Sequence, residues 1–326
     1  MKALDMQRLS SHPLTRCSVF IVISVACQVS SGQEPTSSET LDRPLRVLTA
    51  NIWNYAEPYE LRMKLLREQI TALQPDVIGF QEAGWKSEEE HQVKQLLHGL
   101  NYHIEHESDG SDNKERRLLD VAVASRWPLK RKAFHSLPGS GKALAVEITA
   151  PQPIGRLLFV STFGTARWQF DRELQRERDA VALDRFIREI SDPNGFPPII
   201  AGDFDATPDS ASIRYLTGLQ SLDGHSTHYY DVWKAAGNRG AGHTWTTQNH
   251  YAKKTTEQFW HLSDHHRRID YIFLGSPHHF RGYARVASAR VVLNQPTGTD
   301  WPSDHFGVLA EIATTPEDSE ATGIDK

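Results

Sequence analysis

The sequence predicts a layered α/β domain on the strength of three observations. Apolar stretches of strand length recur along the chain, and patterns with helical periodicity separate several of them. No internal repeat is visible, and no linker long enough to divide domains interrupts residues 44–313. The chain of 326 residues, 39% hydrophobic and 24% charged, has the composition of a globular protein rather than of a disordered one.

The expected elements begin with a strand, a helix and a second strand. A buried strand over 45–50 leads to Asn51, and a helix over 59–74 ends before Pro75 after placing its apolar side chains on one face. The second strand, over 76–80, leads to Glu82. A long helix is expected over 170–190, and further strands are expected over 121–125, 144–148, 157–162, 198–201, 269–274, 285–292 and 306–312.

The N-terminal segment is typical of a secretory signal peptide. Basic residues precede the apolar run 18–26, and small and polar residues follow it up to Gly32. The run is shorter than the roughly 20 residues of a membrane-spanning helix. We therefore expect an exported protein, secreted or periplasmic, without an integral membrane span in its mature form. The expected parts are a signal peptide over 1–32, a linker over 33–43, the folded domain over 44–313 and a flexible tail over 314–326.

Both cysteines, Cys17 and Cys27, lie in this N-terminal segment. The mature domain therefore lacks the residues for a disulfide, a thiolate zinc site or a thiol nucleophile. Residues 24–27 resemble a lipoprotein cleavage box, which leaves lipid anchoring at Cys27 open. The net charge of −5 lowers the expectation of tight, sequence-independent DNA binding, although a local basic groove stays open. We expect a monomer.

The clearest local pattern is the segment Gly202-Asp203-Phe204-Asp205, which follows an apolar strand. Alternation along an extended chain would place Asp203 and Asp205 on one face, where their charges repel unless a cation or a proton lies between them. A hard cation such as Mg²⁺ explains the arrangement. The alternative is an Asx turn that closes the strand.

Two more polar groups adjoin predicted strands. Asp304 and His305 precede the last strand, where His305 could act as a general base at neutral pH or the pair could form a capped turn. Asp270 interrupts an apolar strand and needs a partner. It could hold His305 in the useful tautomer, or it could form a salt bridge with Arg267 or Arg268.

Asn51 and Glu82 complete the set, because parallel strands bring their carboxyl ends to one rim of a sheet. In their order along the chain, these five motifs resemble the endonuclease/exonuclease/phosphatase superfamily, which has the DNase I-like fold. The resemblance covers about residues 44–313. It implies an α/β (α+β) fold, a four-layer sandwich of two mainly antiparallel β-sheets flanked by helices, with the site at one edge.

The resemblance also implies roles for individual residues. Asn51, Glu82 and Asp304 would bind or support a divalent metal, Mg²⁺ or Mn²⁺. Asp203 would orient or deprotonate the attacking water, while Asp270 would orient His305. In this family the histidine contacts the scissile phosphate, so two assignments of His305, phosphate contact and general base, stay open.

Two positions depart from the family pattern. Asp205 stands where the family usually has an asparagine that contacts phosphate, so it could add a metal ligand or alter the phosphate contact. Phe163 stands where relatives commonly carry a histidine or tyrosine, and its ring cannot donate a hydrogen bond. Arg167 is the candidate that could contact the phosphate instead.

The expected function is metal-dependent hydrolysis of a phosphate ester by in-line attack of water, of the phosphodiesterase, nuclease or phosphatase type. Nucleic acid, phospholipid and inositol phosphate stay open as substrates. The alternative is a secreted binding protein that keeps the scaffold but has impaired catalysis because of Phe163.

Other side chains are assigned to ordinary structural roles. The histidine-rich stretch 261–266 could bind zinc with the help of Asp264, but a solvated loop is the preferred interpretation. Trp233 and Trp245 are expected in the core rather than as platforms for substrate.

Overall fold

The computed structural model describes residues 40–87, 90–106, 120–166, 172–259, 265–276 and 284–314. All of them fall within one compact unit of the chain, Ser37–Lys326. Outside the described residues lie the predicted signal peptide with both cysteines, the first part of the predicted linker and almost all of the predicted tail. Arg167 and residues 261–264 also lie outside them.

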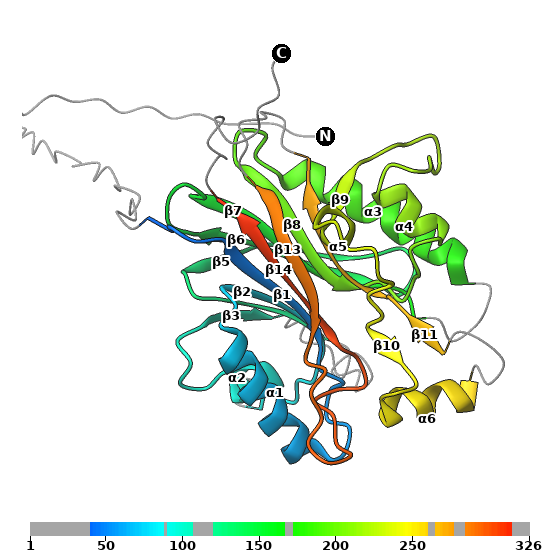
Figure 1. Cartoon of the computed structure of the whole chain (residues 1–326). Helices are drawn as coiled ribbons and strands as arrows, with labels where there is room; N and C mark the ends of the chain where they lie inside the picture. Colours follow the sequence, from blue (N-terminus) through cyan, green and yellow to red (C-terminus); the bar gives the residue numbers. More distant parts are fainter. Residues whose placement is uncertain are drawn as a thin grey trace, which may run out of the picture. The chain divides into compact units, whose positions relative to one another are not determined.

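Two six-stranded sheets form the centre of this unit (Figure 1). The first has the order β13 (Arg285–Val292), β14 (Gly307–Ala313), β1 (Leu45–Asn51), β2 (Val77–Ala83), β4 (Asp120–Ser125), β3 (His103–His106). The second has the order β5 (Leu129–Ser136), β6 (Lys142–Thr149), β7 (Arg156–Phe163), β8 (Phe196–Asp203), β12 (Asp270–Gly275), β9 (Tyr229–Asp231). In each sheet the two middle strands pair in parallel and the other neighbours pair antiparallel. Both sheets are therefore mainly antiparallel, as expected.

Apolar side chains from both sheets fill the space between them, among them Val47 and Val77 from the first sheet and Ile199 and Ile272 from the second. Gly79 in β2 lies directly over the second sheet. A Cβ atom at Gly79 would be 2.9 Å from the Cβ of Ala201, which is closer than such atoms approach. Glycine at this position therefore lets the two sheets pack closely.

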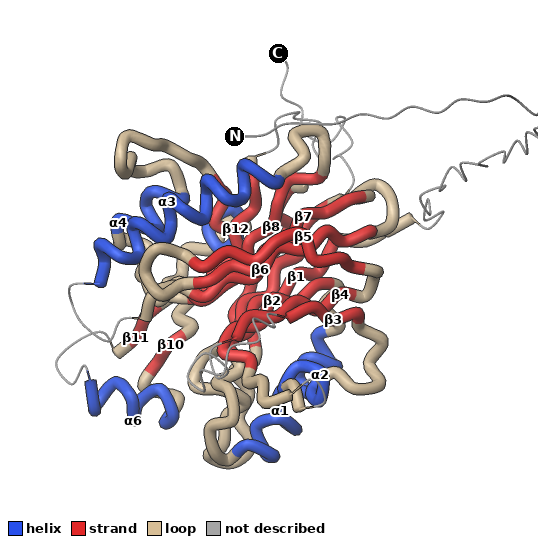
Figure 2. The backbone as a smooth tube through the Cα atoms, turned by 180° about the vertical axis from the view of Figure 1, so that it is seen from behind, coloured by secondary structure: helices blue, strands red, loops and turns tan. Residues whose placement is uncertain are grey.

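Helices cover the outer faces of the two sheets. Figure 2 shows α1 (Tyr59–Leu73) and α2 (Gln92–Leu96) on one side, and α3 (Glu173–Ile190) and α4 (Ala211–Leu216) on the other. Leu66 and Ile70 of α1 pack against the first sheet, and Leu183 and Ile187 of α3 pack against the second. The predicted four-layer sandwich is confirmed.

A two-stranded ribbon, β10 (Trp245–Thr246) and β11 (His266–Arg267), lies outside the two sheets. The helix α6 (His250–Phe259) follows β10, and the short helix α5 (Val232–Ala235) follows β9 (Figure 1). The sequence pattern did not predict these short elements. It also missed β3, β5 and β9, because an edge strand such as β5 carries three consecutive charged residues, Lys130, Arg131 and Lys132, and lacks a continuous apolar run.

The strand pairing brings the predicted polar residues to one rim. Parallel β1 and β2 end together at Asn51 and Ala83, and antiparallel β8 and β12 place Asp203 directly opposite Asp270. The turn before β14 adds Asp304 and His305. None of the described helices is long and apolar enough to cross a membrane.

Candidate active site

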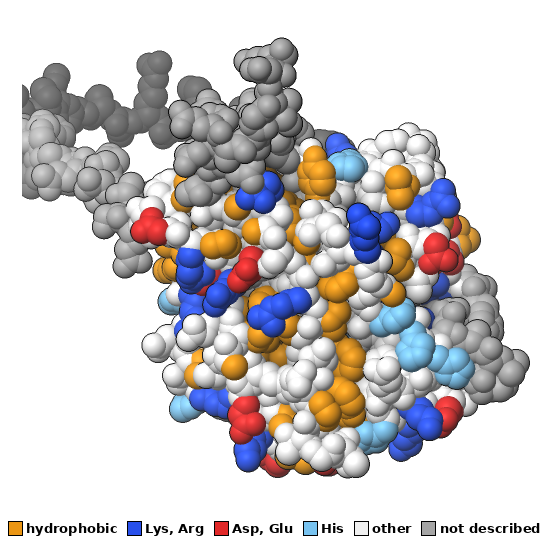
Figure 3. Space-filling view, viewed as in Figure 1, with side chains coloured by type: hydrophobic (Ala, Val, Ile, Leu, Met, Phe, Trp, Pro, Cys, Tyr) orange, Lys and Arg blue, Asp and Glu red, His pale blue; other side chains and the backbone are white. Residues whose placement is uncertain are grey.

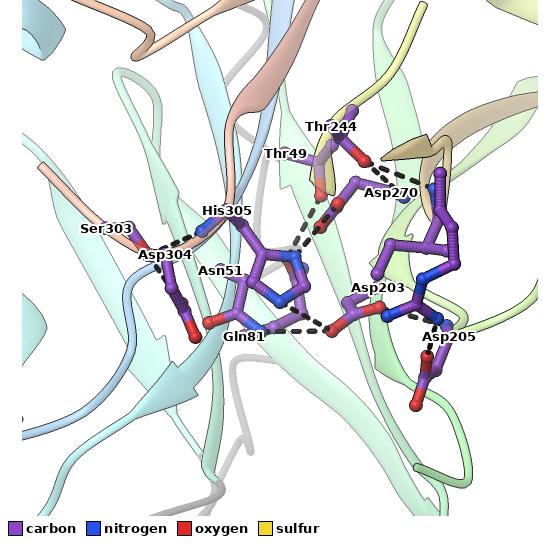
Figure 4. Close-up of polar contacts among 12 residues, drawn as sticks. Thr49, Asn51, Gln81, Asp203, Asp205, Thr244, Asp270, Ser303, Asp304 and His305 are labelled. Atoms are coloured by element: carbon purple, nitrogen blue, oxygen red, sulfur yellow. Dashed lines mark hydrogen bonds and ion pairs between the residues drawn. The ribbon is translucent and has the colours of Figure 1, made fainter. Parts of the chain in front are cut away.

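Six predicted polar residues meet at this rim, where both sheets contribute. They are Asn51, Glu82, Asp203, Asp270, Asp304 and His305, and Figure 4 shows all but Glu82 with labels. Asn51, Asp203, Asp270, Asp304 and His305 are all at most 5% exposed. Buried charges need partners, so the contacts of each residue indicate its role.

Asn51 connects two of the carboxylates. Its amide nitrogen donates hydrogen bonds to Oδ2 of Asp203 at 3.0 Å and to Oε1 of Glu82 at 3.2 Å. The amide oxygen accepts from the backbone nitrogen of Trp53 at 3.0 Å, which fixes the orientation of the amide group. The nitrogen of Asn51 rather than its oxygen therefore faces the carboxylates, so Asn51 holds these two groups in place.

Glu82 occupies a distorted part of β2. Its φ of +48° is left-handed, and the register with β4 shifts between Phe80 and Ala83. This bulge turns the side chain toward the rim, where the amide nitrogen of Asn54 donates to Oε2 at 3.0 Å. Burial, together with the charge of Asp304, raises the pKa of Glu82 to about 7. The carboxylates of Glu82 and Asp304 are therefore close enough to repel each other.

His305 and Asp270 form a buried pair. Nδ1 of His305 lies 3.0 Å from Oδ2 of Asp270, and Nε2 lies 3.9 Å from Oδ2 of Asp203 (Figure 4). Asp270 therefore accepts the Nδ1 proton and directs Nε2 toward Asp203. Burial acts to lower the pKa of His305, but the charges of Asp270, Asp203 and Asp304 outweigh it and raise this pKa well above its usual range.

The rings of His305 and of Trp245 in β10 meet edge to face, with ring centroids 4.9 Å apart and planes at 74°. Trp245 is anchored in turn because its Nε1 donates to Oγ1 of Thr256 in α6 at 3.0 Å. Trp245 is therefore buried, as predicted, but it also restricts the imidazole.

The carboxylates together form a site that fits a divalent cation. Burial raises the pKa of Asp203 to about 8, with further contributions from Asp270 and Asp205 against the opposing charge of His305. Within the described part of the chain, no donor reaches the buried Oδ1 of Asp270. Mg²⁺ and Mn²⁺ prefer oxygen ligands, and a cation would relieve the repulsion between these carboxylates. The residues present therefore fit the expected metal.

Asp304 lies in a turn that several side chains fix. The amide nitrogen of Asn249 donates to the carbonyl oxygens of Ser303 at 2.7 Å and Asp304 at 3.2 Å. Arg62 of α1 donates to the carbonyl oxygen of Pro302 at 3.3 Å. Burial raises the pKa of Asp304, while the charges of His305 and Arg62 oppose that effect.

Asp205 does not lie on one face of a strand with Asp203, and that expectation is wrong. β8 ends at Asp203, and Asp205 has a left-handed φ of +44°. Its backbone nitrogen donates to Oδ1 of Asp203 at 2.9 Å, and its carboxylate accepts from Nη1 of Arg267 at 2.9 Å. The turn after β8 keeps Asp205 at the rim, and its carboxylate faces the guanidinium of Arg267.

Asp270 pairs with His305 rather than with Arg267 or Arg268. Arg268 instead donates to the carboxylate of Asp231.

Phe163 lies at the end of β7, beside Asp203 in the parallel pair with β8. Its ring is 6% exposed and belongs to the apolar core between the sheets. Phe163 therefore supplies packing and no hydrogen bond at this position, in agreement with its chemistry. Arg167, the predicted substitute, lies outside the described residues.

A second polar cluster consists of His91, His106 and Asp120, and Asp120 pairs with Ala83 at the end of β2. Nδ1 of His91 accepts from the backbone nitrogen of Val93 at 3.2 Å, so the proton resides on Nε2, which lies 3.4 Å from Oδ2 of Asp120. A metal would need the lone pair of that nitrogen. We therefore interpret this cluster as a hydrogen-bonded network.

A cavity of about 470 Å³ lies at the opposite end of β8, lined among others by Phe196, Pro198 and Tyr229. None of the rim residues lines it. It is therefore separate from the candidate site.

A family model described as the Endonuclease/Exonuclease/phosphatase family matches residues 48–305. The chain belongs to this family. The matched range begins in β1 and ends at His305, so it includes every polar residue of the rim. The family resemblance inferred from the motifs is confirmed, and the members of this superfamily are metal-dependent phosphoester hydrolases.

Several solved structures share the fold of this chain. D. rerio TDP2 in complex with a single-strand DNA product has a TM-score of 0.62 and 16% identity, covering 84% of this chain and 100% of that chain. The human Nocturnin catalytic domain with a bound sulfate anion has a TM-score of 0.60 and 19% identity, covering 85% and 97%. A Bacteroides vulgatus member has a TM-score of 0.58 and 17% identity, covering 83% and 99%. The comparison with curated proteins finds no match.

Several residues of the site were not singled out from the sequence. Asn54 lies three residues after Asn51, in the same motif. Arg62 precedes Leu66 by four residues and Ile70 by eight, and this helical spacing indicates that it lies on the buried face of α1. Arg267 was considered only as a partner for Asp270. Asn249 left no comparable signal.

Proposed function

We propose that the protein is a divalent-metal-dependent hydrolase of phosphate esters. The observation that carries the proposal is the buried pair of His305 and Asp270 directed at Asp203, beside two further carboxylates at the same rim. A structural role alone gives no reason for placing several acids with raised pKa values in one place. Membership of the Endonuclease/Exonuclease/phosphatase family supports the same reaction class.

Glu82 and Asp304 would hold the cation, with Asn51 keeping Glu82 and Asp203 in position. When bound, Mg²⁺ or Mn²⁺ supplies positive charge that offsets the charge of the phosphate. Arg62 lies behind Asp304 and favours its ionised form, which is the form that binds a cation.

Asp203 would accept a proton from the attacking water. Its Oδ2 atom already receives the Asn51 amide, and its Oδ1 receives the backbone nitrogen of Asp205, so the carboxylate is held in one orientation. His305 would donate from Nε2 to a phosphate oxygen, because Asp270 keeps the imidazole charged. We favour this role for His305 over that of general base, since a protonated imidazole cannot accept a proton.

The reaction can be tested with bis(para-nitrophenyl) phosphate and purified protein in the presence of Mg²⁺ or Mn²⁺. We expect turnover that a chelator abolishes. An Asp203→Ala variant should lose on the order of 10³-fold or more in kcat. An Asp192→Ala variant, altered in the turn before β8 at the opposite end of the strand from Asp203, should keep the kcat of the unaltered protein. Full activity of Asp203→Ala would show that another group activates the water.

The substrate belongs to the phosphoester class. The D. rerio TDP2 relative is described with a single-strand DNA product, which supports testing single-stranded DNA first. A panel that also contains RNA, sphingomyelin and inositol phosphates would rank the classes by kcat/KM.

A binding protein without efficient catalysis is the second candidate, because Phe163 supplies no hydrogen bond to a phosphate. In that case inorganic phosphate would bind in calorimetry without turnover of any ester. A large gain in rate in Phe163→His would indicate an impaired enzyme, and inactivity of both forms would favour the binding protein.

Export is proposed from the N-terminal sequence alone. The full chain, expressed in a bacterium, should be recovered from the periplasm or medium with a mass that corresponds to removal of about residues 1–32. If Cys27→Ser leaves the mass and the fractionation unchanged, lipid anchoring is absent. An intact N-terminus in the cytosolic fraction would contradict the proposal.

A further inference from the structure

The ion pair of Asp205 and Arg267 lies at the edge of the candidate site. Nη1 of Arg267 is 2.9 Å from Oδ1 of Asp205, and the two side chains are 2% and 14% exposed. The guanidinium is thus almost fully buried while the carboxylate keeps some contact with solvent. Removal of either charge therefore changes the electrostatic environment of the other.

Asp205 is tied to the group that would activate water. The backbone nitrogen of Asp205 donates to Oδ1 of Asp203. This hydrogen bond fixes Asp205 beside the carboxylate that would accept the proton of the attacking water. A bare carboxylate there would repel a phosphate ester. A neutral side chain at this position would avoid that repulsion.

We infer that Arg267 is a positioning residue that offsets the charge of Asp205 and so allows a phosphate ester to bind beside an aspartate. The inference rests on the proposed function. Arg267 acts through Asp205 and needs no contact of its own with the substrate. The pair as a whole takes the place of the neutral side chain.

The ribbon that carries Arg267 is also connected to His305. Arg267 lies opposite Trp245 in the β10–β11 pair, with its guanidinium carbon 5.3 Å from the centroid of the indole ring, and Trp245 contacts the imidazole of His305. The backbone nitrogen of Phe306 donates to the carbonyl oxygen of Thr244 at 2.7 Å. One ribbon therefore positions both the compensating charge and the proposed phosphate donor.

The inference predicts an ordered set of kinetic effects. Arg267→Gln should lower kcat/KM by on the order of 100-fold, mainly through KM, because it removes the positive charge 2.9 Å from the carboxylate. Asp205→Asn should stay within about tenfold of the unaltered protein, because it places a neutral group at the site while the amide oxygen can still accept the hydrogen bond of the buried Arg267. The double variant Asp205→Asn/Arg267→Gln should recover most of the loss of Arg267→Gln, and this rescue separates charge compensation from a general structural role.

Binding of inorganic phosphate in the presence of Mg²⁺, measured by calorimetry, provides a readout that is independent of turnover. It should weaken in Arg267→Gln and recover in the double variant. Thermal melting of each variant reports folding. Arg156 and Asp192 offer a matched control, since they form an ion pair of the same 2.9 Å length on the exposed surface. Arg156→Gln should leave kcat/KM unchanged.

The outcomes separate this inference from the proposed function. If the unaltered protein neither binds phosphate nor hydrolyses any ester, the proposed function fails, and the inference fails with it. If the unaltered protein is active but the double variant is no better than Arg267→Gln, the inference alone is overturned. A loss in Asp205→Asn as large as that in Arg267→Gln would also overturn it, because the carboxylate itself would then be required.

Discussion

Nδ1 of His305 lies 3.0 Å from Oδ2 of Asp270, and this contact joins the turn before β14 in the first sheet to the start of β12 in the second. Both side chains are at most 5% exposed. The pair therefore fixes the position of the imidazole and also connects the two sheets at the rim. Its removal should change catalysis much more than folding.

Asp270→Asn keeps the shape of the side chain but removes its charge. We expect kcat to fall by roughly 10²- to 10⁴-fold, because the amide no longer stabilises the protonated imidazole and can favour the wrong tautomer. The pKa of His305 should fall, since the charge of Asp270 is a main cause of its raised value. NMR titration of His305 checks the pKa, and an unchanged pKa would contradict the assigned contact.

Asn51→Asp places a third acid between Glu82 and Asp203 and removes the hydrogen bonds that the amide donates to both. We expect the metal-free protein to lose about 2–4 kcal/mol of unfolding free energy. Mg²⁺ should restore more of the stability in this variant than in the unaltered protein. Urea unfolding with and without Mg²⁺ measures both effects, and equal restoration would contradict the arrangement described.

Metal-free stability should depend on pH through Glu82 and Asp203. Their pKa values in the folded protein, about 7 and about 8, lie above the ordinary values of 4.5 and 3.8. The folded state therefore holds these protons more tightly, so their contribution to stability is fully present below about pH 4 and is lost as the pH rises through 7 to 8.

A cation held by Glu82 and Asp304 would favour the deprotonated form of Glu82 and, through its positive charge, that of Asp203. The increase in Tm caused by Mg²⁺ should therefore be larger at about pH 8.5 than at about pH 6. Thermal melts across this range measure the difference. Glu82→Gln/Asp203→Asn is the control that should remove the pH dependence. A Tm increase that does not vary with pH would argue against these acids as the cation site.

Arg62 is fully buried, and its guanidinium donates to the carbonyl oxygens of five residues, Ile52, Trp53, Asn54, Ala56 and Pro302. Arg62→Met should cost about 3 kcal/mol or more, because these oxygens lose their donor in a buried place. Arg67→Met, on the same helix, should cost about 1 kcal/mol, since Arg67 is partly exposed and donates to the two carbonyl oxygens of Leu96 and His98. Equal losses in urea unfolding would refute the special role of Arg62.

The main strands of both sheets could be predicted because each is a buried apolar run bounded by polar or turn residues, and the structure extends most of them by only a few residues. The sandwich of two sheets could not be derived from those runs, since strand order depends on contacts between distant segments. It came from the resemblance of the motifs to a family. The ribbon of β10 and β11 has two residues in each strand, so it carries no periodic signal at all.

The site was predictable where a polar residue interrupts or ends an apolar strand, as Asp270 and Asp203 do. A supporting residue is harder to predict where its partners are backbone atoms far along the chain. Asn249 illustrates this, since its amide nitrogen bonds to the carbonyl oxygens of Ser303 and Asp304 more than 50 residues away. The departure at Asp205 was visible in the sequence, but the partner that offsets its charge was not.

The ion pair of Asp205 and Arg267 also constrains the order in which a chain with a neutral residue at position 205 could acquire the two residues. An arginine that arises first lies beside a neutral amide and near a bound phosphate, where its charge is tolerated. An aspartate that arises first places a bare charge against the substrate and reduces activity until the arginine follows. Under selection for turnover, the accessible mutational path therefore introduces the arginine before the aspartate. After the second step the arginine can no longer revert alone without a loss of activity, whereas the aspartate can.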